Sequence, residues 1–145
     1  MPLTFRETMA GAWTPLDAPT SERRISFTVR ALSRSLPRFL AKRVVDIEGT
    51  IDAEGLASGS RLYGTLGLDV ARTGTLPYDF HFRGNDGRRY RFVGRKDVTL
   101  SRLLESMTVL PAELHDADGH KVGDATVRFD ASRDMFSFLK SWKIV

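Results

Sequence analysis

Hydrophobic and polar residues alternate most regularly in the segment 78–98. Aromatic residues there occupy every second position on both sides of a short polar stretch: Tyr78, Phe80 and Phe82 before it, Tyr90 and Phe92 after it. A period of two places one side of a strand in a core. A three-residue loop at 85–87 pairs Phe82 with Tyr90 and Phe80 with Phe92, whereas a two-residue loop would place Phe82 opposite an arginine. The pattern therefore predicts a β-hairpin whose loop ends in a left-handed Gly87.

The same alternation predicts further strands, at 25–29, 44–53, 61–71, 108–114 and 120–129, with a closing strand at 142–144. A second three-residue loop, 117–119, is expected to pair Leu114 with Val122. Beyond it the buried positions change parity, which predicts a β-bulge at Gly123.

Helical spacing of leucines and aromatics predicts three short helical connections, at 36–43, 100–107 and 132–139. No long helix is expected that could cover a parallel sheet. The pattern therefore predicts a mainly β fold, an antiparallel up-and-down barrel of roughly eight strands with short connecting helices. The weakly alternating segment 3–13 is expected to lie against this barrel. A two-sheet β-sandwich is the alternative.

Glycine interrupts the predicted inner face of three strands, at Gly49, Gly64 and Gly94. Glycine inside a strand costs packing, so it marks either strong coiling of a sheet or close approach of another group. Coiling is the favoured interpretation, and a ligand that approaches the backbone is the alternative.

Composition fits a single β-barrel domain spanning 1–145, because 41% hydrophobic and 28% charged residues are ordinary globular values. No apolar run approaches the roughly 18 residues that a membrane-spanning helix needs, and the start of the chain does not resemble a signal peptide. A cytoplasmic location is the resulting prediction. The chain has no cysteine, which excludes disulfides, thiolate metal sites and a cysteine nucleophile.

A net charge of +4 raises the question of nucleic-acid binding. Along the sequence the basic residues are interleaved with acidic ones, and no run reaches the roughly five residues of a typical basic patch. Alternation instead places charges in rows on the outer faces of strands: Arg89, Arg91 and Arg95 on one strand, Asp46, Glu48 and Asp52 on another. The distribution predicts a mixed solvated surface and no nucleic-acid partner.

The segment 115–120, HDADGH, is the one apparent cluster of metal-binding or acid–base side chains. In the predicted register Asp116 faces His120, whereas His115 lies on the opposite face, so the two imidazoles diverge. Counted as a calcium loop, it places Val127 where a glutamate is needed. Turn chemistry explains it better, and His81 is expected to point outward. The sequence predicts no metal site, no cofactor and no catalytic residue; an enzyme of unrecognised type stays an alternative without a supporting motif.

Short motifs along nearly the whole chain share one resemblance: Phe5-x-Glu7-Thr8-Met9-x-Gly11, Tyr78-x-Phe80-x-Phe82, Asp86-Gly87-Arg88, Gly94-x-Lys96-x-Val98, Gly123 with Arg128, and Phe138-Leu139. Together they resemble a small domain attached to some bacterial cholesterol-oxidase-like flavoproteins of the glucose-methanol-choline type. The resemblance implies an accessory, lipocalin-like barrel whose neighbours act on sterol-like or other lipidic substrates. The chain lacks the flavin domain and its dinucleotide-binding fingerprint, so no oxidoreductase activity and no catalytic residue carry over.

Two hypotheses of function follow. In the first, the barrel binds a small apolar, sterol-like or lipidic ligand, with the Tyr90 hydroxyl as polar handle, in a cavity lined by Phe27, Ile47, Leu66, Phe80, Phe82, Tyr90 and Phe92. In the second, the barrel is solid and the chain is an interaction or stabilising module for a partner enzyme, such as an oxidoreductase. Aromatic residues at inward positions are what any small barrel uses, so their presence alone favours the solid core.

Overall fold

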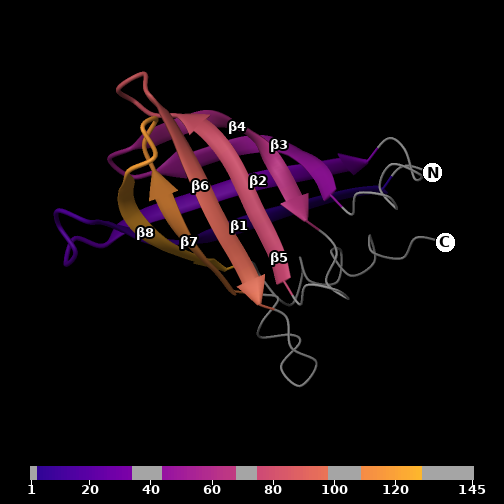
Figure 1. Ribbon diagram of the computed structural model, residues 1–145, viewed down its shortest axis with the longest axis horizontal. Helices are drawn as coiled ribbons and strands as arrows, with labels where there is room; N and C mark the ends of the chain where they lie inside the picture. The colour runs from indigo at the N-terminus through magenta and orange to yellow at the C-terminus, as the bar shows by residue number, and fades with distance from the viewer. Residues whose placement is uncertain (1–2, 34–43, 68–74, 98–108, 129–145) are drawn as a thin grey trace.

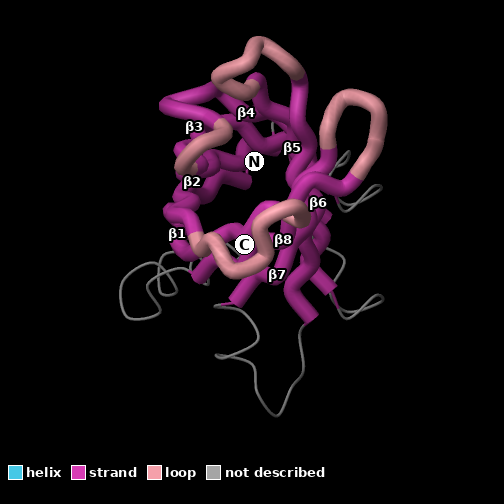
Figure 2. The backbone as a smooth tube through the Cα atoms, turned by 90° about the vertical axis from the view of Figure 1, so that its left-hand side faces the viewer, coloured by secondary structure: helices cyan, strands magenta, loops and turns pink. Residues whose placement is uncertain are grey.

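Eight antiparallel strands close into a barrel in the order of the sequence (Figure 1). The computed structural model describes residues 3–33, 44–67, 75–97 and 109–128. The strands are β1 (Leu3–Pro15), β2 (Arg23–Ser33), β3 (Val44–Ala53), β4 (Ala57–Gly67), β5 (Thr75–Arg83), β6 (Arg89–Asp97), β7 (Val109–His115) and β8 (Lys121–Arg128). Closure comes from pairing of the first strand with the last, so the strands surround a common interior (Figure 2). The predicted barrel is confirmed, and the sandwich alternative is wrong.

Short connecting helices are not part of the described fold, which consists of strands and turns alone. The three predicted helical connections at 36–43, 100–107 and 132–139 lie outside the described residues, as does the predicted closing strand at 142–144. Within the described ranges, no helix is long and apolar enough to cross a membrane.

The central hairpin has the predicted register, with Phe82 opposite Tyr90 and Phe80 opposite Phe92. The amide of Gly84 donates to the carbonyl of Arg88 at 2.8 Å and closes the three-residue loop. Gly87 ends this loop at φ +80°, a conformation that costs a Cβ-bearing residue about 1 kcal/mol or more. The left-handed glycine predicted from the sequence is therefore confirmed.

The N-terminal segment does not lie against the barrel but forms part of its wall, so this prediction is wrong. β1 pairs with β2 from Leu3 to Trp13, and its second half also pairs with β8. The inner face of β1 carries Glu7, Met9 and Trp13, all buried. Because Glu7 is one of these inner residues, the alternation of apolar and polar residues that predicts a strand is weak in this segment.

Two register details differ from the predictions. β4 begins at Ala57 and not at residue 61, because a bulge around Gly59 takes up the extra residues directly after the turn, and Asp52 Oδ1 accepts the Gly59 amide hydrogen at 2.7 Å. In the second hairpin Leu114 pairs with Gly123 and not with Val122. The register shift that causes this lies next to Gly123, where a bulge was predicted.

Two inner-face glycines are required by close contact between neighbouring strands. A Cβ on Gly49 would lie 1.8 Å from the carbonyl oxygen of Thr28 on β2, and one on Gly64 would lie 1.9 Å from that of Asp79 on β5. The groups that approach these glycines are backbone atoms of the adjacent strand. Coiling of the sheet, the favoured interpretation of the sequence, therefore accounts for both positions.

The barrel has two distinct ends. The connections β1–β2, β3–β4, β5–β6 and β7–β8 all lie at one end, here called the turn end. Backbone hydrogen bonds join neighbouring connections there: the amide of Asn85 donates to the carbonyl of Leu56, and the amide of Leu16 to that of Val122, at 2.8 and 3.0 Å. At the other end, β1 begins and β8 ends.

Candidate functional site

All seven residues predicted to line a ligand cavity lie buried on the inner face of the barrel and belong to one core cluster: Phe27, Ile47, Leu66, Phe80, Phe82, Tyr90 and Phe92. They come from five consecutive strands, β2 to β6, and sequence parity placed each of them correctly. The structure thus brings the predicted set together, while its role in ligand binding stays a prediction.

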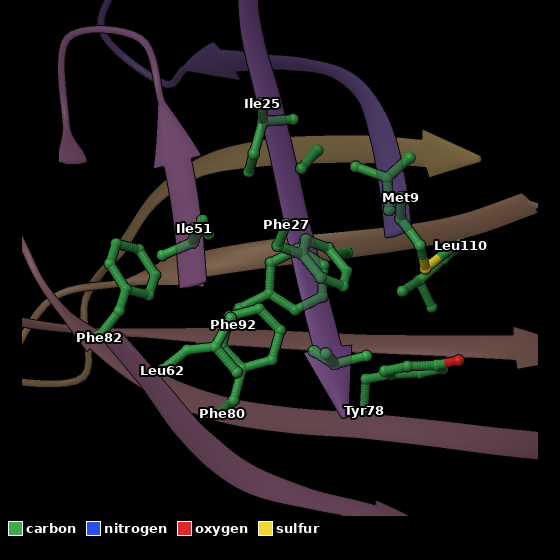
Figure 3. Packing of buried hydrophobic residues seen from close by; sticks show 14 of the residues in the cluster. Met9, Ile25, Phe27, Ile51, Leu62, Tyr78, Phe80, Phe82, Phe92 and Leu110 are labelled. Atoms are coloured by element: carbon green, nitrogen blue, oxygen red, sulfur yellow. The ribbon is translucent and has the colours of Figure 1, made fainter. Parts of the chain in front are cut away.

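Most of the aromatic members pack directly on one another (Figure 3). Phe80 and Phe92 stack with ring centroids 4.6 Å apart, and Phe27 meets both rings edge-on at 5.1 and 5.2 Å. Phe82 and Tyr90 stack at 5.9 Å. These are the offset and edge-to-face contacts typical of a filled core, so the rings satisfy one another in the half of the interior near the turn end.

The Tyr90 hydroxyl, the predicted polar handle, is engaged within its own hairpin. It donates to Asp86 Oδ2 at 2.7 Å, while Asp86 Oδ1 accepts the amide hydrogen of Arg88 at 2.9 Å. The hydrogen bond from Tyr90 lowers the pKa of Asp86, and the same bond raises the pKa of Tyr90. This hydroxyl therefore stabilises the loop at 85–87.

A buried carboxylate and a buried phenol meet inside the barrel at Glu7 and Tyr78. The exposed fraction of Glu7 is 1% and that of Tyr78 is 0%. The Tyr78 hydroxyl donates a short hydrogen bond to Glu7 Oε1. Glu7 is on β1 and Tyr78 on β5, four strands away in a closed barrel of eight, so this bond crosses the interior from one wall to the opposite one.

Among the described residues, the strand neighbours of this Glu7–Tyr78 pair are apolar. Tyr78 is the register partner of Leu66 on β4 and of Gly94 on β6, and Glu7 is the partner of Val29 on β2. Leu66 and Val29 are fully buried, and Gly94 adds no side chain beside the phenol ring. Transfer of a carboxylate into such surroundings costs several kcal/mol unless hydrogen bonds compensate it.

Burial has a clear effect on the ionisation of Tyr78. Desolvation, followed by the negative charge of Glu7 and the hydrogen bond to it, raises the pKa of Tyr78 well above its ordinary value. The phenol therefore stays protonated and acts as a fixed hydrogen-bond donor, not as a base. Chemically the pair offers a carboxylate acceptor beside an oriented hydroxyl, which suits recognition of one polar group in an apolar interior.

Sequence reasoning did not select either member of this pair as a site residue. Glu7 has the same strand parity as Met9 and Trp13, and that parity would have identified it as an acidic residue on an inner face. Because segment 3–13 was not assigned to the barrel, this signal was not used. Tyr78 was placed on the aromatic face but not among the ligand contacts.

The apparent metal cluster near the second hairpin is explained by turn chemistry. Ligand atoms of Asp116, Asp118 and His120 lie within 4.8 Å of one another. However, Asp116 Oδ1 accepts the amide hydrogens of Asp118 and His120, both at 2.9 Å, and these bonds help to lower the pKa of Asp116. His115 instead contacts Glu113 through Nε2 at 3.1 Å. The arrangement caps a tight turn, as predicted.

His81 is exposed, as its parity predicted.

Comparisons with protein-family models, with curated proteins and with solved structures gave no match to this chain. The resemblance to an accessory domain of flavoproteins therefore stays a prediction, and no family is assigned to the chain.

Proposed function

We propose that this chain is a non-catalytic binding barrel that holds a small, largely apolar ligand through one polar group. The observation that carries this proposal is the Glu7–Tyr78 pair, a carboxylate and a phenol that are fully buried among side chains that, in the described part of the chain, are otherwise apolar. Apolar side chains of similar size would fill this space at no desolvation cost. Strongly perturbed ionisable groups in an apolar interior mark candidate functional sites.

The chemistry of the pair defines the class of ligand. A carboxylate accepts hydrogen bonds, so the polar group of the ligand must donate one, as a hydroxyl or an amine does. An apolar body with one hydroxyl describes a sterol-like or lipidic alcohol. This is the class that the resemblance of the sequence motifs also implied.

The position of the pair moves the proposed site away from the centre of the aromatic cluster. Leu66, the direct register partner of Tyr78, and Ile47 on β3 would contact the apolar body of the ligand. The stacked rings of Phe80 and Phe92 then form the base of the site and not its wall.

Two matched variants test the proposal, Tyr78→Phe and Tyr90→Phe. Each removes one hydroxyl from an inward-facing tyrosine. Binding of a fluorescent sterol analogue would be measured for the wild type, Tyr78→Phe and Tyr90→Phe. Because the Tyr78 hydroxyl orients the Glu7 carboxylate that accepts from the ligand, we expect Tyr78→Phe to weaken binding about tenfold, or about 1.4 kcal/mol, and Tyr90→Phe to leave it unchanged. An analogue without the hydroxyl should not distinguish Tyr78→Phe from the wild type.

The opposite pattern would overturn this assignment. Loss of binding in Tyr90→Phe alone would show that the ligand makes its polar contact with Tyr90, at the turn end of the barrel. Retention of full affinity in both Tyr78→Phe and Glu7→Gln would show that the pair takes no part in binding. Thermal unfolding of each variant would be recorded to ensure that the binding data refer to folded protein.

A second candidate function is favoured by the packing of the aromatic rings. Rings at 4.6 to 5.2 Å fill the interior near the turn end as a core does. In this alternative the barrel is a solid interaction or stabilising module, with a partner enzyme on its outer surface. Absence of binding of any hydroxyl-bearing or apolar probe to the wild type would favour it.

A further inference from the structure

The outer face of the barrel carries charged side chains in rows that run across the strands. One such row is neutralised. Arg30 on β2 contacts Glu48 on β3 at 2.8 Å, and Arg91 on β6 makes two contacts with Asp79 on β5, at 2.8 and 2.5 Å. These are the cross-strand pairs of opposite charge that commonly decorate a sheet.

The next row towards the turn end is different, because it contains three arginines on adjacent strands. Arg83 on β5 lies directly opposite Arg89 on β6. The β4–β5 register pairs Leu62 with Phe82, which places Arg61 beside Arg83. All three arginines are exposed, and no carboxylate among the described residues forms an ion pair with any of them. Like charges in direct opposition destabilise a sheet, so the row has a cost that a bound anion would relieve.

The backbone beneath this row is held in place. The Ser60 hydroxyl donates to the carbonyl oxygen of Arg83 at 2.6 Å and accepts its amide hydrogen at 3.2 Å. This reciprocal contact fixes β4 against the end of β5. The arginine Cα atoms are thus fixed in advance at the spacing of adjacent strands, roughly 4.8 Å.

An exposed aromatic ring stands beside the arginine row. Tyr63 on β4 has an exposed fraction of 57% and is the register partner of His81 on β5. Arg61, Tyr63, His81, Arg83 and Arg89 line one hollow of the outer surface. A second hollow, over β1 to β4, includes Arg6 and the ion pair of Arg30 with Glu48, and it shares Arg61 and Tyr63 with the first.

Two hollows that share residues form one continuous track across six strands, on the order of 20 Å long at the usual strand spacing. We propose that this track, here called the Tyr63 track, binds single-stranded nucleic acid without strong sequence preference. The guanidinium groups would contact successive phosphates, and a base would stack on the Tyr63 ring. A basic groove combined with an exposed aromatic platform is the usual means of such binding.

A linear polymer fits these observations better than a compact anion does. A single phosphate would occupy one hollow, whereas arginines line both: Arg61, Arg83 and Arg89 on three adjacent strands, and Arg6 on β1 beyond the Arg30–Glu48 ion pair. The ring of Tyr63, at the junction of the hollows, offers a stacking surface that an acidic peptide does not need. The track is not visible as a run of basic residues in the sequence, because its arginines come from five different strands.

The test is fluorescence anisotropy with a labelled 12-nucleotide oligo-dT and oligo-U, at several salt concentrations. Three phosphate contacts predict a slope of log affinity against log salt of about −2. Arg83→Glu should weaken binding at least tenfold, and Tyr63→Ala roughly tenfold, while Tyr63→Phe keeps the ring and most of the affinity. The matched control is Arg128→Glu, since Arg128 is exposed on β8, lines neither hollow, and its replacement makes the same change of net charge.

Several results would overturn the proposal. Equal loss in Arg128→Glu and Arg83→Glu would show attraction by net charge alone. Full affinity in Tyr63→Ala would remove the stacking contact, and failure to bind either oligonucleotide at low salt would remove the site. Competition by poly-glutamate as strong as that by unlabelled oligonucleotide would identify an acidic polypeptide as the partner instead.

Discussion

The Tyr78 hydroxyl donates to the Glu7 carboxylate across the full width of the barrel, joining β5 to β1. In a closed barrel these strands are on opposite walls and share no backbone hydrogen bonds. The side-chain bond therefore couples two strands that have no direct backbone pairing with each other. Its contribution can be measured separately from the cost of burying its partners.

A double-mutant cycle on this pair should show strong coupling. Tyr78→Phe leaves a buried carboxylate without its phenol donor, so we expect it to lower the free energy of unfolding by about 1–3 kcal/mol. Glu7→Leu/Tyr78→Phe removes both polar groups and should cost less than the sum of the single variants. Urea denaturation of the four proteins gives the coupling energy. Additive costs would mean that the bond contributes nothing to stability.

Alkaline pH should destabilise the fold through Tyr78. Because burial raises the pKa of Tyr78 in the folded state, the unfolded chain loses this proton first, near its ordinary pKa of about 10. The contribution to stability is complete below that pH and decreases as the pH rises above it. We expect Tyr78→Phe to show a smaller loss of stability between pH 9 and 11 than the wild type.

Glu7→Gln is the informative companion to that measurement. It removes the negative charge but leaves the phenol buried, and burial is the larger cause of the raised pKa. The alkaline loss of stability in Glu7→Gln should therefore lie between those of the wild type and Tyr78→Phe. A loss as small as that of Tyr78→Phe would assign the effect to charge and not to burial.

The strands and their inner faces could be predicted from the sequence wherever apolar residues alternate cleanly. The register of the central hairpin could be predicted from the parity of its aromatic residues: Phe80, Phe82, Tyr90 and Phe92. β1 was not recognised because Glu7 occupies an inner position, where a period of two expects an apolar residue. The residue that concealed the strand is thus the one that defines the candidate site.

Features that depend on contacts between distant strands were not accessible in this way. The Glu7–Tyr78 bond joins residues 71 positions apart, and no local pattern relates them. The arginine row depends on the registers of β4, β5 and β6 together, and a shift of one residue in any of them would turn its side chains inward. The sequence therefore predicted rows of charge along single strands, whereas this row of arginines runs across three strands.

Replacement of Gly49 tests how closely the strands approach. Gly49→Ala would place a Cβ 1.8 Å from the backbone oxygen of Thr28, so β2 and β3 must separate locally. We expect a cost at or above the upper end of the roughly 1–3 kcal/mol typical of overpacking. Gly94→Ala is the matched control, since the atoms nearest to its added Cβ, Ala112 Cβ, Leu110 Cδ1 and Pro111 O, all lie farther away, at 3.0 Å. Equal costs in thermal unfolding would contradict the close-contact explanation.

The aromatic cluster provides the final prediction, which concerns how solidly the turn-end half of the barrel is packed. Phe80 is fully buried, stacks on Phe92 and meets Phe27 edge-on, whereas Phe82 has an exposed fraction of 3% and has ring contacts to Phe80 and Tyr90 at 6.3 and 5.9 Å. Phe80→Ala should therefore cost about 3–5 kcal/mol, and Phe82→Ala less within that range or below it.

His81 lies between these two phenylalanines in sequence but on the outer face, which makes it the natural control. His81→Ala should change the free energy of unfolding by less than about 0.5 kcal/mol, because exposed positions tolerate substitution. The three variants can be compared by chemical denaturation if the slope of unfolding free energy against denaturant concentration is the same in each. If Phe80→Ala cost no more than His81→Ala, the rings would not be a packed core, and the site would have to extend into the turn-end half, where Phe27 and Phe92 would then contact the ligand directly.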